Sequence, residues 1–236
     1  MEKVLKQLVE KLERAFGDGL ISTVLYGSAA VGDYHDRYSD INILCVLREI
    51  TPAELRECEP IFTWWRELGN PSPLLLTEFE VKTSTDCFPI EFHDIKERRR
   101  ILQGTDVVAD LEIDDKYYRA QVEHELRAKL LRLRQKSAGI LSEKDVLARL
   151  LAESVSTFCI LARHALRLTG IEPGWQKRDI VGHAVEGFGI DPAPFTTLLD
   201  LREERIKPKS VDSVSLLEQY LKEIQRVIEA VDRIGQ

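Results

Sequence analysis

The chain begins with a helical pattern and then changes to short apolar runs. From residue 1 to 16, apolar residues recur at spacings of three and four, which predicts a helix that ends at Gly17-Asp18-Gly19. Residues 21–26 and 41–47 have the length and β-branched content of strands, and the apolar runs 73–77 and 88–95 are predicted to be two more. Between them, Thr51-Pro52-Ala53-Glu54 has the form of a capping box, which predicts a helix to about Leu68.

From residue 115 the pattern changes to long amphipathic runs. They predict helices over 117–137, 142–168, 176–186, 192–204 and 211–234, with Ser142 and Asp145 as a Ser-x-x-acid cap on the second. The sequence therefore predicts an α+β protein. Residues 1–113 would form a mixed β-sheet domain with helices on one face and the other face open, and residues 114–236 an all-α helical bundle domain. We expect the open face and the bundle to form a ligand cleft.

The segment between the first two strands carries the first chemical signal. Gly27-Ser28 follows the first strand, and a small turn there lets backbone N–H groups and a serine hydroxyl approach phosphate oxygens. A helix beginning at the turn would add its positive end. Because strand side chains alternate, Asp40 and Asn42 should share one face while the isoleucines next to them pack behind. This face is the expected place for a metal and a nucleotide.

A further acid lies in the fourth predicted strand. Glu91 stands inside the apolar run 88–95, where a carboxylate is costly to bury unless it has a role. Mg²⁺ is usually held by one or two carboxylates together with substrate phosphates, so Asp40 and Glu91 from neighbouring strands are candidate ligands. Asn42 can offer a carbonyl oxygen but no charge. The sequence thus predicts weaker metal binding, a one-metal site or an inactive site.

Gly27-Ser28 followed by Asp40-Ile41-Asn42 resembles the pattern of the DNA polymerase beta-like nucleotidyltransferase superfamily. That pattern is a hydrophobic residue, Gly-Ser, a short loop and two carboxylates one residue apart, of which the second is Asn42 here. The sequence is most similar to aminoglycoside nucleotidyltransferases of the streptomycin/spectinomycin type, which have a similar Tyr-Gly-Ser-Ala turn followed by Ser-Asp-Ile. The resemblance implies that the first domain is of the nucleotidyltransferase type.

The resemblance also implies an activity and a set of site residues. The activity is Mg²⁺-dependent transfer of a nucleoside monophosphate, AMP from ATP in the first instance, to a hydroxyl of a small acceptor. Glu91 would be the general base or a further metal ligand, and Lys177 matches the position from which the second domain brings a lysine to the triphosphate. The implied catalytic residues are Asp40 and Glu91, the nucleotide-binding residues Gly27, Ser28 and Lys177, and the metal ligands Asp40, Asn42 and Glu91.

Two other functions compete with this one. Because of Asn42, the protein could bind nucleotide without turning it over. A ribonuclease is the third class, since helical domains of this superfamily resemble the HEPN bundle, whose nucleases carry Arg, four to six residues and then His. Arg178 and His183 fit that spacing, but so do Arg119 and His124, which indicates how easily the spacing arises.

The composition of the chain limits the classes of binding partner that we expect. The chain has 236 residues and a net charge of −7 from 33 basic and 40 acidic residues, which disfavours a broad nucleic-acid-binding surface and favours a cationic acceptor. The absence of a leader and of an apolar stretch of about 18 residues predicts a cytoplasmic protein with no membrane partner. The four cysteines lack metal-ligand spacing and are expected to be reduced packing residues. The oligomeric state is left open, a homodimer included.

Overall fold

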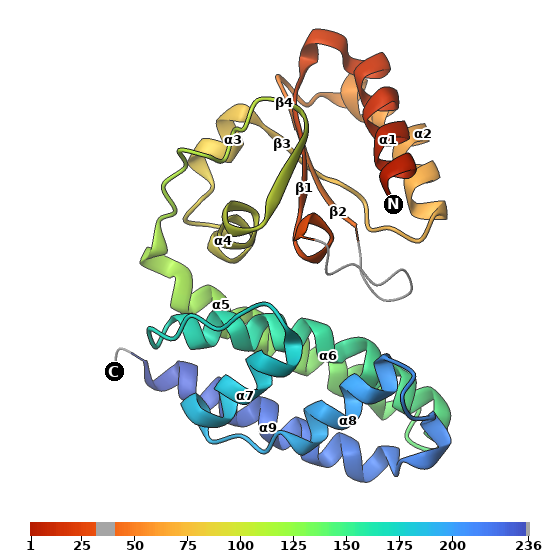
Figure 1. Cartoon of the computed structure of the whole chain (residues 1–236), viewed down its shortest axis with the longest axis vertical. Coiled ribbons are helices and arrows are strands. Elements are labelled where there is room, and N and C mark those ends of the chain that lie inside the picture. The colour runs from red at the N-terminus through yellow and green to blue at the C-terminus, as the bar shows by residue number, and fades with distance from the viewer. Residues whose placement is uncertain (32–40, 235–236) are drawn as a thin grey trace. The chain divides into compact units, whose positions relative to one another are not determined.

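The computed structural model describes residues 1–31 and 41–234 and divides into two compact units, Met1–Lys116 and Tyr117–Gln236 (Figure 1). The division lies close to the boundary at 113/114 that the sequence suggests. Whether the two units are independently folding domains stays a prediction.

In its described part, unit 1 contains a four-stranded mixed sheet with the strand order β3-β2-β1-β4. The strands are β1 (Leu20–Tyr26), β2 (Asn42–Leu47), β3 (Leu74–Thr77) and β4 (Arg99–Gly104). β1 pairs antiparallel with both β2 and β4, whereas β3 pairs parallel with β2. The first three strands and the mixed α+β fold class are therefore confirmed.

One face of the sheet is covered by α1 (Glu2–Phe16) and α2 (Pro52–Glu67), with the short 3-10 helix η1 (Gly17–Gly19) between α1 and β1 (Figure 1). Leu8 and Leu12 of α1 and Trp65 of α2 are fully buried against the sheet. The predicted capping box is present, because the Thr51 hydroxyl accepts from the Ala53 N–H and Glu54 accepts from the Thr51 N–H. Both predicted helices are thus confirmed.

The other face is covered as well, so the expectation of an open face is wrong. α3 (Glu78–Thr83), α4 (Pro89–Glu97) and residues 105–113 pack on it, with Val24 and Leu44 of the sheet contacting the same cluster as Phe92 and Ile95 (Figure 1). The run 88–95 is therefore a helix and the strand prediction for it is wrong. Pro89 is at a first-turn position, which suits a helix start and not a central strand. The fourth strand of the sheet, on the side of β1 away from β2, is β4 instead.

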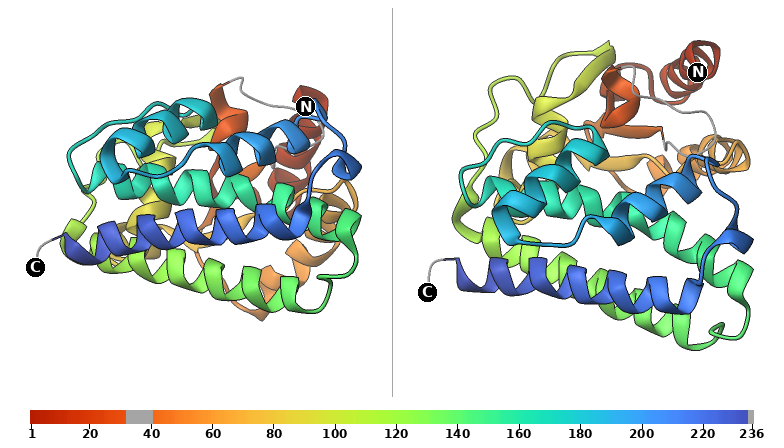
Figure 2. Two further views of the ribbon diagram at one scale, coloured as in Figure 1. Left: turned by 90° about the horizontal axis from the view of Figure 1, so that it is seen from below. Right: turned by 60° about the horizontal axis from the view of Figure 1, so that its bottom comes forward.

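Unit 2 is a helical bundle, as predicted (Figure 2). Its helices are α5 (Tyr118–Ala138), α6 (Lys144–Arg167), α7 (Lys177–Phe188), α8 (Ala193–Arg202) and α9 (Ser213–Arg233), with short 3-10 helices η3 (Asp115–Tyr117) before α5 and η4 (Pro208–Ser210) before α9. Their ends agree with the predicted ends to about two residues. α6 packs against the four other long helices and forms the centre of the unit.

The start of α6 differs from the prediction. The predicted cap by Ser142 is wrong, because the Glu143 N–H donates to the Ile140 carbonyl and the helix begins one residue later at Lys144, without a side-chain cap. In the core, Tyr220 contacts the rings of Phe158 and Phe195 edge to face. Within residues 1–31 and 41–234, the helices are too short or too polar to cross a bilayer.

Candidate functional site

The glycine turn and the start of β2 lie next to each other. Tyr26, the last residue of β1, is in antiparallel register with Asn42, the first residue of β2. Gly27 has a φ of +77°, and a Cβ atom on it would lie 3.2 Å from the Asn42 Nδ2. Glycine is favoured here by its conformation and by the tight contact with the asparagine amide. The turn continues into η2 (Ser28–Val31), a single 3-10 turn, at the place where the sequence predicts that a helix begins.

Asn42 lies on the α4 face of the sheet. Strand alternation groups it with Leu44, which packs in the α4 cluster, while Ile41 and Ile43 pack in the α1–α2 cluster. The prediction that these isoleucines pack behind is confirmed. Tyr26 also packs in the α4 cluster and is in register with Arg99 of β4. Asn42, Tyr26 and Arg99 therefore form a row across three strand ends, called the polar row here.

Glu91 reaches the same face, but from a helix. It is an exposed residue in the first turn of α4, whose Phe92 and Ile95 are 1% and 0% exposed against the sheet. Burial raises the pKa of Tyr26 to about 12, and the nearby negative charges of Glu91 and Asp94 add to that rise. The Tyr26 hydroxyl therefore loses its proton even less readily than an ordinary tyrosine, beside two carboxylates.

Other predicted site residues lie elsewhere or outside the described range. Asp40 and the side chain of Ser28 are outside it, so their roles stay predictions. Lys177 is the half-buried first residue of α7 in unit 2, and its role in binding phosphate also stays a prediction. Among residues 1–31 and 41–234, no group of three or more His, Cys, Asp and Glu side chains is arranged to hold a metal ion.

Sequence reasoning missed Tyr26, Asp94 and Arg99. Arg99 was hidden because the Arg98-Arg99-Arg100 run resembles an exposed basic segment, although Arg98 ends α4 and Arg99 begins β4. The signal that could have identified the strand is the apolar pair Ile101-Leu102, because the long stems of arginines can cover apolar surface at a strand's start. The run also contacts the turn directly, since the Gly27 N–H donates to the Arg98 carbonyl over 3.1 Å.

The arginines of the ribonuclease spacing have structural partners. Arg178 of α7 donates to Asp200 over 2.7 Å and to Glu203 over 2.8 Å, which links α7 to the C-terminal part of α8. Hydrogen bonds to these carboxylates raise the pKa of Arg178 further above its usual value. Arg119 donates to Glu123 one turn along α5. These ion pairs within unit 2 give both arginines a structural role.

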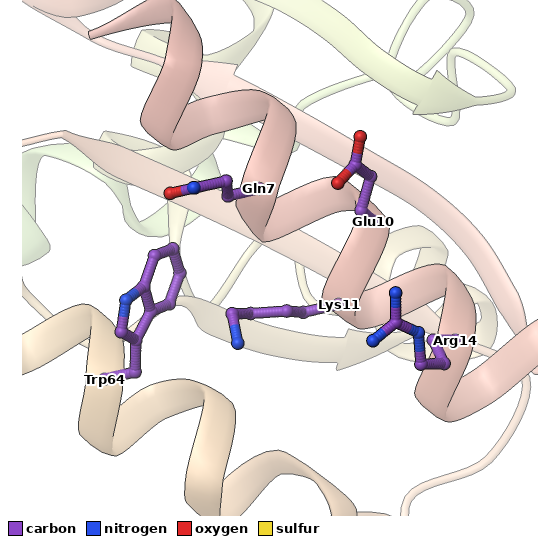
Figure 3. A pocket seen from close by; sticks show the side chains of 5 residues that line it. All are labelled: Gln7, Glu10, Lys11, Arg14 and Trp64. Carbon is purple, nitrogen blue, oxygen red and sulfur yellow. The ribbon is translucent and has the colours of Figure 1, made fainter.

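A surface hollow of about 320 Å³ lies on the opposite side of unit 1, between α1 and α2 (Figure 3). Its lining is Gln7, Glu10, Lys11, Arg14 and Trp64, and the Lys11 ammonium is 5.0 Å from the centroid of the Trp64 ring. No residue predicted for the nucleotide site lines this hollow. Because α1 and α2 cover the face of the sheet opposite to α4, the sheet separates this hollow from the polar row.

Comparisons with known proteins identify the fold. No protein-family model and no curated protein matches the sequence. The structure is similar to the crystal structure of spectinomycin adenyltransferase AAD(9) from Enterococcus faecialis with ATP and spectinomycin. The TM-score is 0.59 and the sequence identity 13%, and the match covers 98% of this chain and 99% of that chain. The chain thus has a nucleotidyltransferase-like fold, as the sequence pattern implied.

Proposed function

We propose that this protein is a nucleotidyltransferase that transfers AMP from ATP to a hydroxyl of a small acceptor. The observation that carries the proposal is the contact of Asn42 with the positive-φ Gly27, on the sheet face to which α4 brings Glu91. The similarity in fold to an adenyltransferase supports it, over nearly the whole length of both chains. Fold similarity does not identify an acceptor, so the proposal rests on this site.

The proposed reaction exchanges one bond at phosphorus for another. The acceptor oxygen attacks the α-phosphorus of ATP, the bond from that phosphorus to the bridging oxygen breaks, and pyrophosphate leaves with the electron pair. The hydroxyl proton passes to the carboxylate of Glu91, which is exposed and so accessible to an acceptor. The protein's main contributions are alignment and charge neutralisation.

Each member of the site has a proposed role. Gly27 shapes the turn through its positive φ while its own N–H donates to the Arg98 carbonyl, Ser28 holds phosphate oxygens there, and Lys177 supplies a positive charge to the triphosphate. Tyr26 is protonated at neutral pH, as its pKa of about 12 reinforces, and can donate a hydrogen bond toward the carboxylates of α4. Asp40 is the proposed second acid of the site.

The donor set is chemically suited to Mg²⁺. Asn42 and Glu91 carry oxygen donors of the type that this hard cation prefers, and Asp40 would complete the set. When bound, Mg²⁺ would neutralise charge on the triphosphate. Because Asn42 contributes no charge, we propose that this site binds the ion more weakly than one with a third carboxylate.

The asparagine also supports a second candidate. A protein with this fold could bind nucleotide without turnover if the missing carboxylate is essential. The net charge of −7 favours a cationic acceptor under the first proposal and has no bearing on the second. A cytoplasmic location, where ATP is supplied, is part of both proposals, and a homodimer stays a prediction.

The experiment is a transfer assay with the full chain. ATP, GTP, CTP and UTP are each supplied with Mg²⁺ and a panel of aminoglycosides and aminocyclitols that includes spectinomycin, and pyrophosphate and nucleotidylated acceptor are measured. We expect pyrophosphate in proportion to adenylated acceptor, with ATP preferred. Nucleotide binding by calorimetry, without pyrophosphate for any acceptor, would support the inactive binding protein instead.

The role of residue 42 is tested by Asn42→Asp, with Asn70→Asp as the control. Both changes add one negative charge, but Asn70 lies in the turn after α2, outside the proposed site. A large gain in transfer by Asn42→Asp would mean that the missing charge limits the natural protein. An unchanged rate would mean that the site works with one acid fewer.

A further inference from the structure

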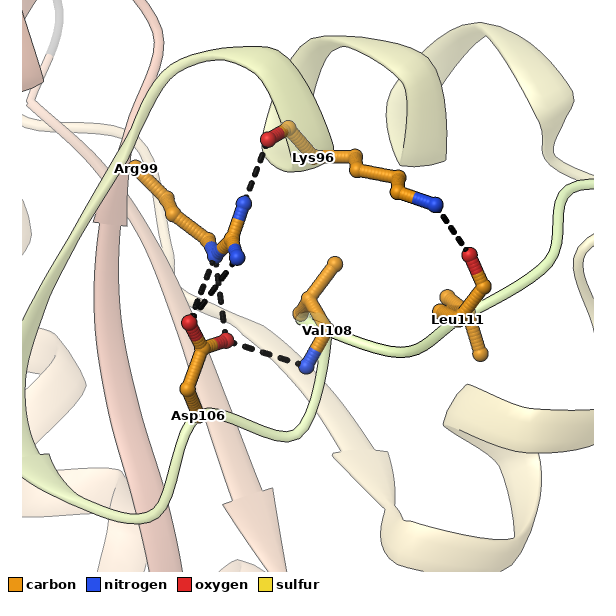
Figure 4. A network of polar contacts seen from close by, with 5 residues as sticks. All are labelled: Lys96, Arg99, Asp106, Val108 and Leu111. Carbon is orange, nitrogen blue, oxygen red and sulfur yellow. Dashed lines mark hydrogen bonds and ion pairs between the residues drawn. The ribbon is translucent and has the colours of Figure 1, made fainter.

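The Arg99 side chain connects the C-terminal end of α4 to Asp106, in the segment that follows β4 (Figure 4). Its Nε and Nη2 atoms donate to both carboxylate oxygens of Asp106, at 2.9–3.0 Å. The carboxylate in turn accepts from the Val108 N–H, and Val108 is fully buried under the α4 face. Because Arg99 and Asp106 are 20% and 33% exposed, this ion pair is better shielded from water than the usual surface pair.

The same guanidinium also holds the end of α4. Its Nη1 donates to the Lys96 carbonyl in the last turn of the helix that carries Glu91. The Lys96 ammonium then donates to the Leu111 carbonyl over 2.5 Å, so that residues 105–111 are tied to α4 at both ends (Figure 4). A cation near the C-terminus of a helix is also favourable for the helix dipole.

The backbone next to Arg99 holds the glycine turn. The Arg98 carbonyl accepts from the Gly27 N–H, and the Arg98 N–H donates to the Asp94 carbonyl of α4. Arg98 thus lies between the turn that should bind phosphate and the helix that carries the proposed base. The next residue is Arg99, whose side chain is fastened to Asp106.

We propose that Arg99 is a positioning residue that fixes α4, and with it Glu91, relative to the glycine turn. The catalytic consequence rests on the proposed function, but the structural claim does not. Arg99 acts through Lys96, Arg98 and Asp106 rather than on the substrate. Lysine cannot replace it, because the planar, five-donor guanidinium bonds Asp106 and Lys96 at once.

The neighbouring arginine provides a matched control. Arg100 is on the other face of the same strand and donates to Glu2 of α1 over 3.0 Å. It is therefore also in an arginine–carboxylate ion pair, which joins the same strand to α1, whereas Arg99 pairs with Asp106 in the segment after β4. Arg99→Lys and Arg100→Lys make the same chemical change, but the first alone breaks the link to α4.

The first readout is hydrogen exchange of single amides in the full chain. In Arg99→Lys we expect the Gly27 and Arg98 amides to lose protection by about tenfold, and the amides of the β1–β2 pair to keep theirs. In Arg100→Lys all of these should be unchanged. Equal loss throughout unit 1 would indicate general destabilisation and would overturn the proposal, as would unchanged protection at Gly27 and Arg98.

Asp106→Asn keeps the test decisive if Arg99→Lys does not fold. It leaves the guanidinium but removes the charge that fastens it, so the same two amides should lose protection to a smaller extent. In the double variant, the loss should be no greater than in Arg99→Lys, because both changes break one linkage. Additive losses would overturn the proposed linkage.

The second readout is the rate of AMP transfer. Displacing a general base should lower kcat about tenfold or more in Arg99→Lys while the KM for ATP changes less than about twofold. An active wild-type enzyme with an unchanged kcat in Arg99→Lys contradicts the positioning role. If the wild type transfers nothing, the proposed function fails, and the exchange data then decide the structural claim by themselves.

Discussion

The two faces of the sheet in unit 1 are made from the same strands but differ at the strand ends. On the α1–α2 face the apolar core continues to the ends of β1 and β2, where Leu25, Ile41 and Ile43 are at most 3% exposed. On the α4 face, the same level of the sheet carries the polar row Asn42, Tyr26 and Arg99. One face is closed by packing, and the other ends in hydrogen-bonding groups.

This difference indicates where chemistry is feasible. A polar group at the edge of a core is costly unless it is hydrogen-bonded or has a function, and Arg99 meets that condition through Asp106. Tyr26 lies beside the acids of α4, and Asn42 faces the glycine turn. At the ends of β1 and β2 the α1–α2 face carries buried apolar residues instead, and its charged group, Arg100 of β4, is paired with Glu2 of α1.

The largest effect that would test this contrast is on turnover. Glu91→Gln removes the proposed base and should lower the rate of AMP transfer by about 10²–10⁴-fold. Glu57→Gln makes the same change on an exposed position of α2 and should leave the rate unchanged. Steady-state rates of both variants check this. Equal rates for Glu91→Gln and the wild type would remove the base from the mechanism.

The next effect is on the two cores. Phe92→Ala on α4 and Leu8→Ala on α1 both empty a fully packed position, and each should lower the free energy of unfolding by about 2–5 kcal/mol. At a temperature where both remain folded, Phe92→Ala should also slow transfer, because Glu91 is its neighbour, while Leu8→Ala should not. Urea unfolding and rate measurements together check this, and slowing by both variants would contradict it.

Smaller effects are expected at two matched capping boxes. Thr51 begins α2 on one face and Thr77 begins α3 on the other, and each exchanges hydrogen bonds with a glutamate three residues later. Thr51→Ala and Thr77→Ala should each cost about 1 kcal/mol of stability. Neither cap is part of the polar row, so transfer rates should not change. A rate loss in Thr77→Ala would extend the site to α3.

The smallest effect concerns pH. Hydrogen bonds from Arg99 lower the pKa of Asp106, so the ion pair stabilises the folded state above the unfolded pKa of about 3.9 and this contribution is lost as the pH falls through the folded value. At pH 7 the free energy of unfolding of the wild type should exceed that of Asp106→Asn by about 0.5–1 kcal/mol. Unfolding curves should converge in acid. A difference that does not shrink as the pH falls from 7 into the acid range would exclude the charge as its cause.

Much of the fold follows from local patterns. The periodicity of α5 to α9 and the capping box at Thr51 identify their helices, because they arise from neighbouring residues. The run 88–95 was assigned wrongly because a short apolar segment fits both a strand and a helix. The place beside β1 that was predicted for this run is taken by β4, which pairs with β1 although the two strands are far apart in the sequence. Such contacts leave little local signal in Arg98-Arg99-Arg100.

The candidate site could be predicted in part for the same reason. Gly27 and Asn42 belong to a local motif and lie close together, since a Cβ on Gly27 would be 3.2 Å from the Asn42 amide nitrogen, while their roles in a site stay predictions. Glu91 was chosen for its chemistry and lies on the expected face, but on a different element. Tyr26 and Arg99 join the site through cross-strand register, which the sequence pattern does not encode.

The most direct test is a crystal structure of the full chain with Mg²⁺ and a non-hydrolysable ATP analogue. Our account predicts the triphosphate at the Gly27-Ser28 turn, with a phosphate oxygen or the metal within reach of the Asn42 side chain. A nucleotide bound instead in the hollow between α1 and α2, against Lys11 and Trp64 (Figure 3), would place recognition on the opposite face and contradict it.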